Sequence, residues 1–101
     1  MEAMEAASVY DGHSVYPVFR VKYHGPTDTR GSYVRATIKR DGKRLTASEP
    51  YDHAISGFGG FQEQAVRVAL ELRGKQFPNA LPVREAIVGD SENGYDVIFT
   101  V

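Results

Sequence analysis

Basic side chains that can contact phosphate or carboxylate groups are concentrated in one stretch of the chain. Residues 13–46 contain eight basic and two acidic residues, whereas residues 47–101 contain four basic and eight acidic residues. A surface built from the first stretch would be cationic, although the whole chain carries a formal net charge of only −1. Segregated charge of this kind favours association with anionic partners.

Two segments of this stretch, 19–24 and 33–40, alternate between apolar and polar residues. Successive side chains of a β-strand point to opposite faces, so each segment predicts a strand with one apolar and one basic face. The outer face of the predicted sheet carries several cations and one aromatic ring. These candidate binding residues are Arg20, Lys22, Tyr33, Arg35, Lys39 and Arg44.

The pair Asp41-Gly42 follows the second segment and predicts a two-residue hairpin turn into a third strand. In the resulting register Ile38 opposes Leu45, and both side chains point toward the core because directly opposed residues share a face. The next rung places Lys39 opposite Arg44 on the outer face.

Two interpretations of this basic outer face remain open. The solvated face of an antiparallel sheet is ordinarily polar, and lysine and arginine also protect exposed strand edges. However, like charges placed opposite one another, as at Lys39 and Arg44, destabilise a sheet. That cost is the argument for a binding surface, but the sequence does not choose between the two interpretations.

The long connection between the first two strands, residues 25–32, is a second candidate contact region, because long loops are often functional. Its candidate binding residues are Thr27, Asp28 and Arg30. The arginine is suited to bidentate contact with phosphate or carboxylate. The alternative is a self-capped turn in which Arg30 pairs with Asp28.

Residues capable of acid–base or metal chemistry are few and scattered. The histidines, His13, His24 and His53, do not show a metal-ligand spacing, and the chain has no cysteine. The carboxylates of Glu49 and Asp52 flank a proline turn, and we expect them to be solvated. The sequence therefore predicts no catalytic residue, no metal site and no cofactor.

One helix is predicted over residues 61–73, where apolar residues recur at helical spacing and Gly74 follows as a cap. Its polar side is expected to hold Gln64 and Arg67, with Arg67 paired to glutamates one turn away on either side. A hairpin is predicted from strands at 83–88 and 95–101, joined by a turn at 89–94. The predicted fold is therefore α+β, an antiparallel sheet of about five strands in the order β-β-β-α-β-β with one helix packed on one face.

The chain of 101 residues is expected to form one domain, residues 13–101, preceded by an N-terminal arm, residues 1–12. No apolar run approaches the length of about 20 residues that a membrane span needs, and the acidic N-terminus does not match a signal peptide. We therefore expect a cytoplasmic protein with no membrane partner.

The segment VKYHGPTDTRGS at 21–32, with the DGK turn and PYDHA at 50–54, resembles small proteins of unassigned function from phages and other bacterial mobile elements. The resemblance covers roughly residues 19–73. It implies an accessory protein, in the host cytoplasm if phage-encoded, that binds a host protein or nucleoprotein complex. An inhibitor of a host defence system such as CRISPR (an anti-CRISPR protein) is one example.

The predicted function is that of a non-catalytic binding protein with such a host partner. The alternative is a nucleic-acid-binding protein that uses the basic outer face. Against this alternative, the pI of about 6.3 is lower than that of most such domains, and only one aromatic residue is predicted on the outer face. The chain is expected to be a monomer, or a homodimer formed through exposed strand edges.

Overall fold

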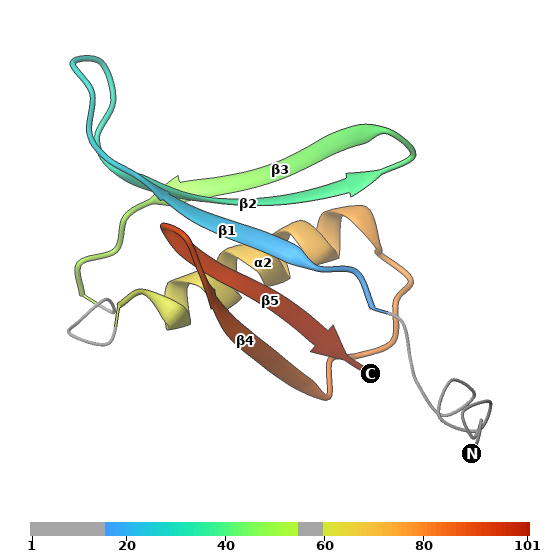
Figure 1. The fold of residues 1–101 in the computed structure, drawn as a ribbon. Coiled ribbons are helices and arrows are strands. Elements are labelled where there is room, and N and C mark those ends of the chain that lie inside the picture. The colour runs from blue at the N-terminus through green and yellow to red at the C-terminus, as the bar shows by residue number, and fades with distance from the viewer. Residues whose placement is uncertain (1–15, 55–59) are drawn as a thin grey trace.

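The computed structural model describes residues 16–54 and 60–101, which form a five-stranded antiparallel sheet with one helix on one face (Figure 1). This architecture confirms the predicted α+β fold and its element order. The predicted N-terminal arm lies outside the described residues. The elements in chain order are β1 (Phe19–His24), β2 (Tyr33–Arg40), β3 (Lys43–Pro50), α2 (Gln62–Gln76), β4 (Glu85–Ser91) and β5 (Gly94–Thr100).

The sheet order is β3-β2-β1-β5-β4, so β1 lies at the centre and joins two hairpins. The β2–β3 hairpin flanks it on one side and the β4–β5 hairpin on the other (Figure 1). The sequence did not reveal this order, because alternation assigns side chains to faces but does not choose neighbours. The order leaves β3 and β4 as the two edges.

The β2–β3 hairpin confirms the predicted Asp41-Gly42 turn. Both turn residues have positive φ, 53° and 76°, as a turn that matches the twist of the flanking strands requires. Ile38 opposes Leu45, and Lys39 opposes Arg44, as the register predicted. The turn therefore fixes which side chains of both strands face the helix.

The core lies between the helix and the inner face of the sheet. Val68 and Leu72 of α2 are fully buried against it, and the rings of Phe19 and Phe99 pack at 5.5 Å. The helix covers β2 and β3 most and β4 least. The buried hydrophobic residues are Phe19, Val21, Val34, Ala36, Ile38, Ala47, Ala65, Val68, Ala69, Leu72, Tyr95, Val97 and Phe99.

The helix ends later than the sequence predicted. It continues through Gly74 to Gln76, and the N–H of Phe77 donates to the carbonyl of Arg73 at 2.8 Å. Phe77 packs against the core, and this tertiary contact holds the additional turn in place. Gly74 is therefore an interior helix residue and not the predicted cap.

The second hairpin turns more tightly than predicted. Its turn is Glu92-Asn93, not residues 89–94, and Asn93 takes a positive φ of 61°. Gly94 belongs to β5 and lies so close to β1 that a β-carbon there would be 1.8 Å from the carbonyl oxygen of Val21. The prediction was wrong because Gly89, Asp90 and Ser91 are common turn formers that here continue a strand.

Candidate functional site

The outer face of β1, β2 and β3 brings the predicted basic residues together. Arg20 lies opposite Thr37, and Lys22 lies opposite Arg35 across the β1–β2 ladder. Directly opposed residues share a face, so these side chains lie on the same surface as Lys39 and Arg44. We call Arg20, Lys22, Tyr33, Arg35, Lys39 and Arg44 the basic face.

A shallow trough of about 590 Å³ runs across part of the basic face. Four cationic side chains line it, and no carboxylate is among its lining residues. A concave surface with one sign of charge focuses the electrostatic potential and raises the local concentration of anions. The residues that line the trough are Pro17, Val18, Arg20, Lys22, Thr37, Ile38, Lys39 and Arg44.

The cations of the basic face differ in how firmly they are held. The ammonium group of Lys22 donates to the hydroxyl of Ser91 at 3.2 Å and to the carbonyl of Glu92, so it is tied to the β4–β5 turn. Arg35 Nε and Asp96 Oδ1 are both buried without a hydrogen-bond partner among the described residues. Asp96 opposes Arg20 across the β1–β5 ladder, at the border of the basic face.

The loop at 25–32 extends from one corner of the sheet (Figure 1). Its Arg30 lies over the ring of Tyr33. The guanidinium carbon of Arg30 lies 3.5 Å from the centroid of the Tyr33 ring, and His24 stacks on that ring at 4.7 Å. Two groups so close to one ring must occupy opposite faces of it, because on the same face they would overlap. Within the described chain, therefore, both faces of Tyr33 are covered, and the predicted Arg30–Asp28 pairing is not formed.

The rest of this loop matches the self-capped alternative in part. Thr27 donates its N–H to the carbonyl of Arg30 at 2.7 Å, which closes the tip. Thr27, Asp28 and Arg30 are all solvent-exposed. The tip is thus a closed turn whose arginine extends the cationic surface toward Tyr33.

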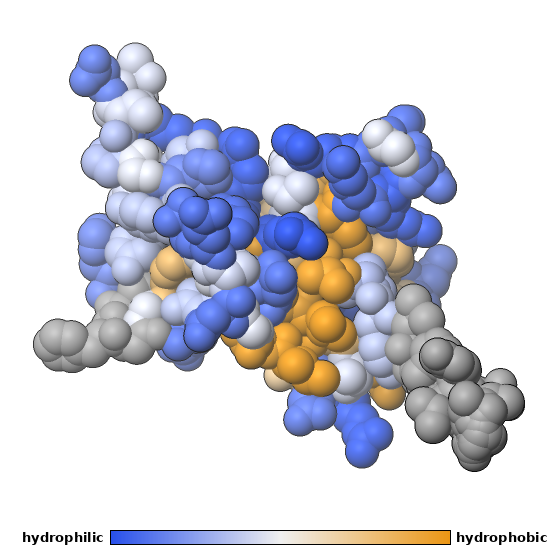
Figure 2. All heavy atoms as spheres, in the orientation of Figure 1, coloured by the Kyte–Doolittle hydropathy of each residue, from blue (hydrophilic) through white to orange (hydrophobic). Residues whose placement is uncertain are grey.

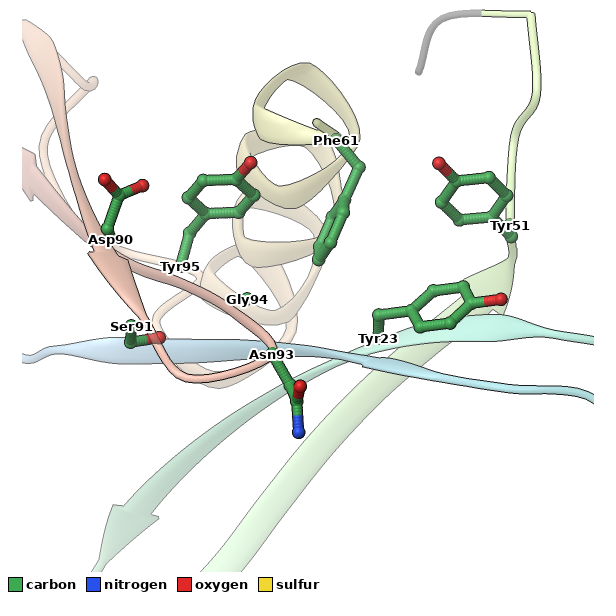
Figure 3. Close-up of a pocket in the computed structure, with 8 residues that line it drawn as sticks. All are labelled: Tyr23, Tyr51, Phe61, Asp90, Ser91, Asn93, Gly94 and Tyr95. Atoms are coloured by element: carbon green, nitrogen blue, oxygen red, sulfur yellow. The ribbon is translucent and has the colours of Figure 1, made fainter. Parts of the chain in front are cut away.

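An aromatic pocket of about 490 Å³, which the sequence did not predict, lies at the other side of the sheet, near the start of α2 (Figure 3). Phe61 packs against Tyr95 at 4.9 Å and lies 6.2 Å from both Tyr23 and Tyr51. Its lining residues are Tyr23, Tyr51, Phe61, Asp90, Ser91, Asn93, Gly94 and Tyr95. The signals in the sequence were separate: Tyr23 and Tyr95 continue the alternation of their strands, and Phe61 begins the apolar stripe of the helix.

The rings of this pocket mainly contact one another, in edge-on or tilted arrangements that stabilise aromatic clusters. Gly60 lies close to the hydroxyl of Tyr95, since a β-carbon at that position would be 2.0 Å from it. The pocket is an apolar hollow lined by one carboxylate, that of Asp90. This arrangement locks the start of α2 onto the sheet.

The carboxylates Glu49 and Asp52 are not free in solvent as predicted, because Arg67 joins them. Its Nη2 lies 2.6 Å from Glu49 Oε1 and 3.3 Å from Asp52 Oδ2. Partial burial raises the pKa of Glu49, but hydrogen bonds from Arg67 and from Gln64 outweigh it and hold that pKa below its ordinary value. The predicted pairing of Arg67 with glutamates of its own helix was wrong, because the side chain reaches the end of β3.

The two histidines that the structure describes each contact a different aromatic ring. His24 stacks on Tyr33, and His53 meets the edge of Tyr51 at 4.7 Å. His13 lies outside the described residues. Among the described residues no group of three or more metal-binding side chains comes together.

The comparisons with known proteins identified no relative, so the basic face is the main observation that bears on function. Neither a scan against protein-family models nor searches of curated proteins and solved structures found a match. The resemblance to mobile-element proteins therefore stays a prediction. No helix in the described part of the chain is long and apolar enough to cross a membrane.

Proposed function

We propose that this is a non-catalytic binding protein whose basic face docks on the phosphate backbone of nucleic acid, free or within a host nucleoprotein complex. The observation that carries the proposal is the trough, in which four cations meet without a lining carboxylate. Phosphate groups are the ligands that such a surface attracts most strongly, through charge-assisted hydrogen bonds and release of counterions.

Backbone contact fits the basic face better than base recognition does. Stacking on bases needs exposed ring faces, and both faces of Tyr33 are covered, by His24 and by Arg30. The hydroxyls of Thr37, Thr46 and Ser48 lie on the same side of the sheet and add neutral donors for phosphate oxygens. Binding is therefore expected to depend strongly on salt and weakly on sequence.

The mobile-element resemblance supports a host nucleoprotein complex as the setting. Accessory proteins of this kind act by binding nucleic acid or the complexes of a host defence system such as CRISPR. A cationic sheet face can occupy the path of a nucleic acid in such a complex through its backbone alone. The cytoplasm of the host is the corresponding location.

The test is fluorescence anisotropy with labelled single-stranded DNA, duplex DNA and RNA at two salt concentrations. With four phosphate contacts, log K should fall with log salt with a slope of about −2.8 for single strands and about −3.6 for duplex DNA. The variant Lys39→Glu/Arg44→Glu should weaken binding about 10-fold or more, because each reversal removes a phosphate contact and adds repulsion.

The hairpin offers a matched control one rung away. Arg40→Glu/Lys43→Glu makes the same charge change at an opposed pair on the other face of the sheet. This control should bind within about threefold of the wild type, since net charge alone has a weaker effect than a lost contact. No binding at low salt, or equal losses in the two double variants, would show that the basic face is not a nucleic-acid site.

A second candidate function is docking on an acidic protein surface of the host. Val18 is 39% exposed and lines the trough beside the cations, and Ile98 lies on the same face of the sheet. A phosphate backbone offers nothing to these apolar groups, whereas a protein surface offers both apolar and acidic contacts. In that case oligonucleotides stay unbound, while pull-down from host lysate retains a partner that Lys39→Glu/Arg44→Glu loses and Arg40→Glu/Lys43→Glu keeps.

A further inference from the structure

The edge strand β4 carries two acidic residues, Glu85 and Asp90, but lacks the lysine and proline that most often block pairing with another chain. Edge strands commonly carry lysine, proline or a bulge, and β3 has both Lys43 and Pro50. From Glu85 to Ser91, β4 has neither lysine nor proline, and nearly every residue in it is exposed. Ile87 is 50% exposed.

Apolar side chains extend from this edge onto the outer face of the sheet. Ile87 lies directly opposite Ile98 of β5, so both side chains point to the outer face. Figure 2 shows hydrophobic residues gathered in the region of β5 and β4, between hydrophilic areas on either side. A patch of this kind at an open edge marks an interaction surface.

The direction of the free backbone groups on β4 follows from the ladder. Tyr23 donates its N–H to the carbonyl of Asn93, so the backbone groups of these two residues point at each other. In an antiparallel ladder, successive residues point their N–H and C=O groups alternately to one side and to the other. The β1–β5 and β5–β4 registers carry this alternation from Asn93 across to β4. On β4, the backbone groups of Ala86, Val88 and Asp90 therefore point away from β5, toward the open edge.

We propose that a second copy of this chain pairs with β4, antiparallel and two-fold symmetric about Ile87. In this register Ile87 meets the partner's Ile87, and Ala86 meets the partner's Val88. Arg84 meets the partner's Asp90, and symmetry makes this opposite-charge pair twice. The backbone groups of Ala86 and Val88, which point to the open edge, then join the two sheets into one of ten strands. Arg84 precedes β4 and donates its N–H to the carbonyl of Thr100, so it contributes only its side chain to the pairing.

The side chains select this register over its neighbour. Symmetry about Val88 would set Ile87 against the partner's Gly89 and Ala86 against the partner's Asp90, which pairs apolar side chains with glycine or a carboxylate. Symmetry about Ile87 aligns Ile98 and Ile87 with the same residues of the partner in one apolar row. Aligned apolar pairs and opposite charges are the contacts that stabilise neighbouring strands.

The interface consists of one strand and a narrow row of side chains, so the dimer is expected to depend on concentration. Stable interfaces bury about 1,200–2,000 Å² of total surface, and smaller interfaces are typical of weak, transient association. The two-fold axis is perpendicular to the sheet, so both basic faces lie on the same side. A role for the two faces in binding one anionic partner rests on the proposed function, but the dimer itself does not.

The test is sedimentation equilibrium across a series of protein concentrations, with circular dichroism to confirm that each variant is folded. The wild type should approach twice the chain mass of 11.2 kDa at high concentration. Arg84→Asp and Asp90→Arg should each weaken dimerisation at least 10-fold, because either change sets like charges against each other at both ends of the interface. The double variant Arg84→Asp/Asp90→Arg restores opposite charges and should recover the dimer.

Glu92→Arg provides the matched control, since the same charge change falls in the adjacent turn and should leave the dimer intact. A chain that stays monomeric at every concentration would overturn the proposal. So would a dimer that both single variants leave unchanged, or one that only Glu92→Arg dissociates. Oligonucleotide binding is measured separately, so loss of the dimer and loss of the basic-face function are distinguishable.

Discussion

Gln64 shows how one buried polar side chain can join a strand to a helix. Its amide nitrogen donates to Glu49 Oε1 at 3.0 Å and to the carbonyl of Pro50 at 2.8 Å, while its amide oxygen accepts from the N–H of Asp52 at 2.9 Å. The side chain is fully buried, so the groups it satisfies have little access to water. It fixes the exit of the chain from β3 against the first turn of α2.

The sequence alone placed Gln64 on the solvated side of the helix, because polar residues usually lie there. Helical spacing assigns an angle to each residue but does not identify a polar partner from another element. Here the orphan backbone groups at the end of β3 supply that partner. The same limit explains why Arg67 was assigned to its own helix and not to Glu49 and Asp52.

Glu49 should make the stability of the protein sensitive to acid. Its pKa is lowered in the folded state by the hydrogen bonds from Arg67 and Gln64, which outweigh partial burial. A carboxyl group with a lowered folded pKa stabilises the fold above its unfolded pKa, near 4.3, and loses this contribution as the pH falls through the folded value. Thermal melts from pH 7 to pH 3 should therefore show a decrease in Tm that begins below about pH 4.5.

The variant Glu49→Gln isolates this effect. It should be less stable than the wild type at pH 7 and should lose less stability on acidification, so the two curves converge at low pH. Glu71→Gln is the control, because Glu71 forms an exposed pair with Lys75 at 3.3 Å, and exposed pairs contribute little. Curves for Glu49→Gln and the wild type that run parallel would contradict this role of Glu49.

At the scale of elements, the sequence specified strands and their faces well. Alternation identified β1 and β2, and Asp41-Gly42 set the β2–β3 register because both residues accept positive φ. This was enough to place the predicted cations on one face. The ends of elements were less predictable where a contact with a distant residue decided them. Packing of Phe77 against the core sets the end of α2, and the close approach of β1 sets the place of Gly94 in β5.

The glycines of these two elements should respond oppositely to the same substitution. Gly74 lies inside α2, and a β-carbon there would meet no atom within 4 Å. Gly74→Ala should therefore raise the free energy of unfolding by about 0.5–1 kcal/mol, since alanine loses less backbone entropy in a helix. Gly94→Ala should lower it, because the new methyl group would strike the backbone of Val21.

Chemical denaturation of both variants measures these effects. The substitution is identical, so each variant is the control for the other. If Gly94→Ala raises the free energy of unfolding, β5 and β1 do not approach as closely as in this structure. If Gly74→Ala lowers it, the end of α2 differs from this structure.

At the scale of the whole molecule, charge and apolar surface are divided over the sheet. The order β3-β2-β1-β5-β4 places the basic strands β2 and β3 on one side of the central β1, and Ile87 and Ile98 on the other. The sequence predicted the basic residues of the candidate site. The trough, the covered rings of Tyr33 and the aromatic pocket could not be predicted, since each depends on strand neighbours or loop conformation.

This arrangement concentrates like charges that face one another across strands. Lys39 opposes Arg44, and Lys22 opposes Arg35. Each such pair reduces stability by about 0.2–1 kcal/mol. If the basic face exists to bind an anionic partner, removing its charge should stabilise the free protein and weaken binding together.

The variant Lys39→Gln/Arg44→Gln should therefore have a higher Tm than the wild type at low salt, by about 1–6 °C for a gain of up to 1 kcal/mol. Because ions screen exposed charges, the difference should shrink as salt is raised to about 0.5 M. Lys75→Gln is the control, since Lys75 pairs with Glu71 and its neutralisation relieves no repulsion. Thermal melts at both salt concentrations, beside anisotropy with the same oligonucleotides, measure the two effects. A double variant that gains no stability at low salt would mean that these cations do not strain the sheet, which would leave a solvated face as the better description.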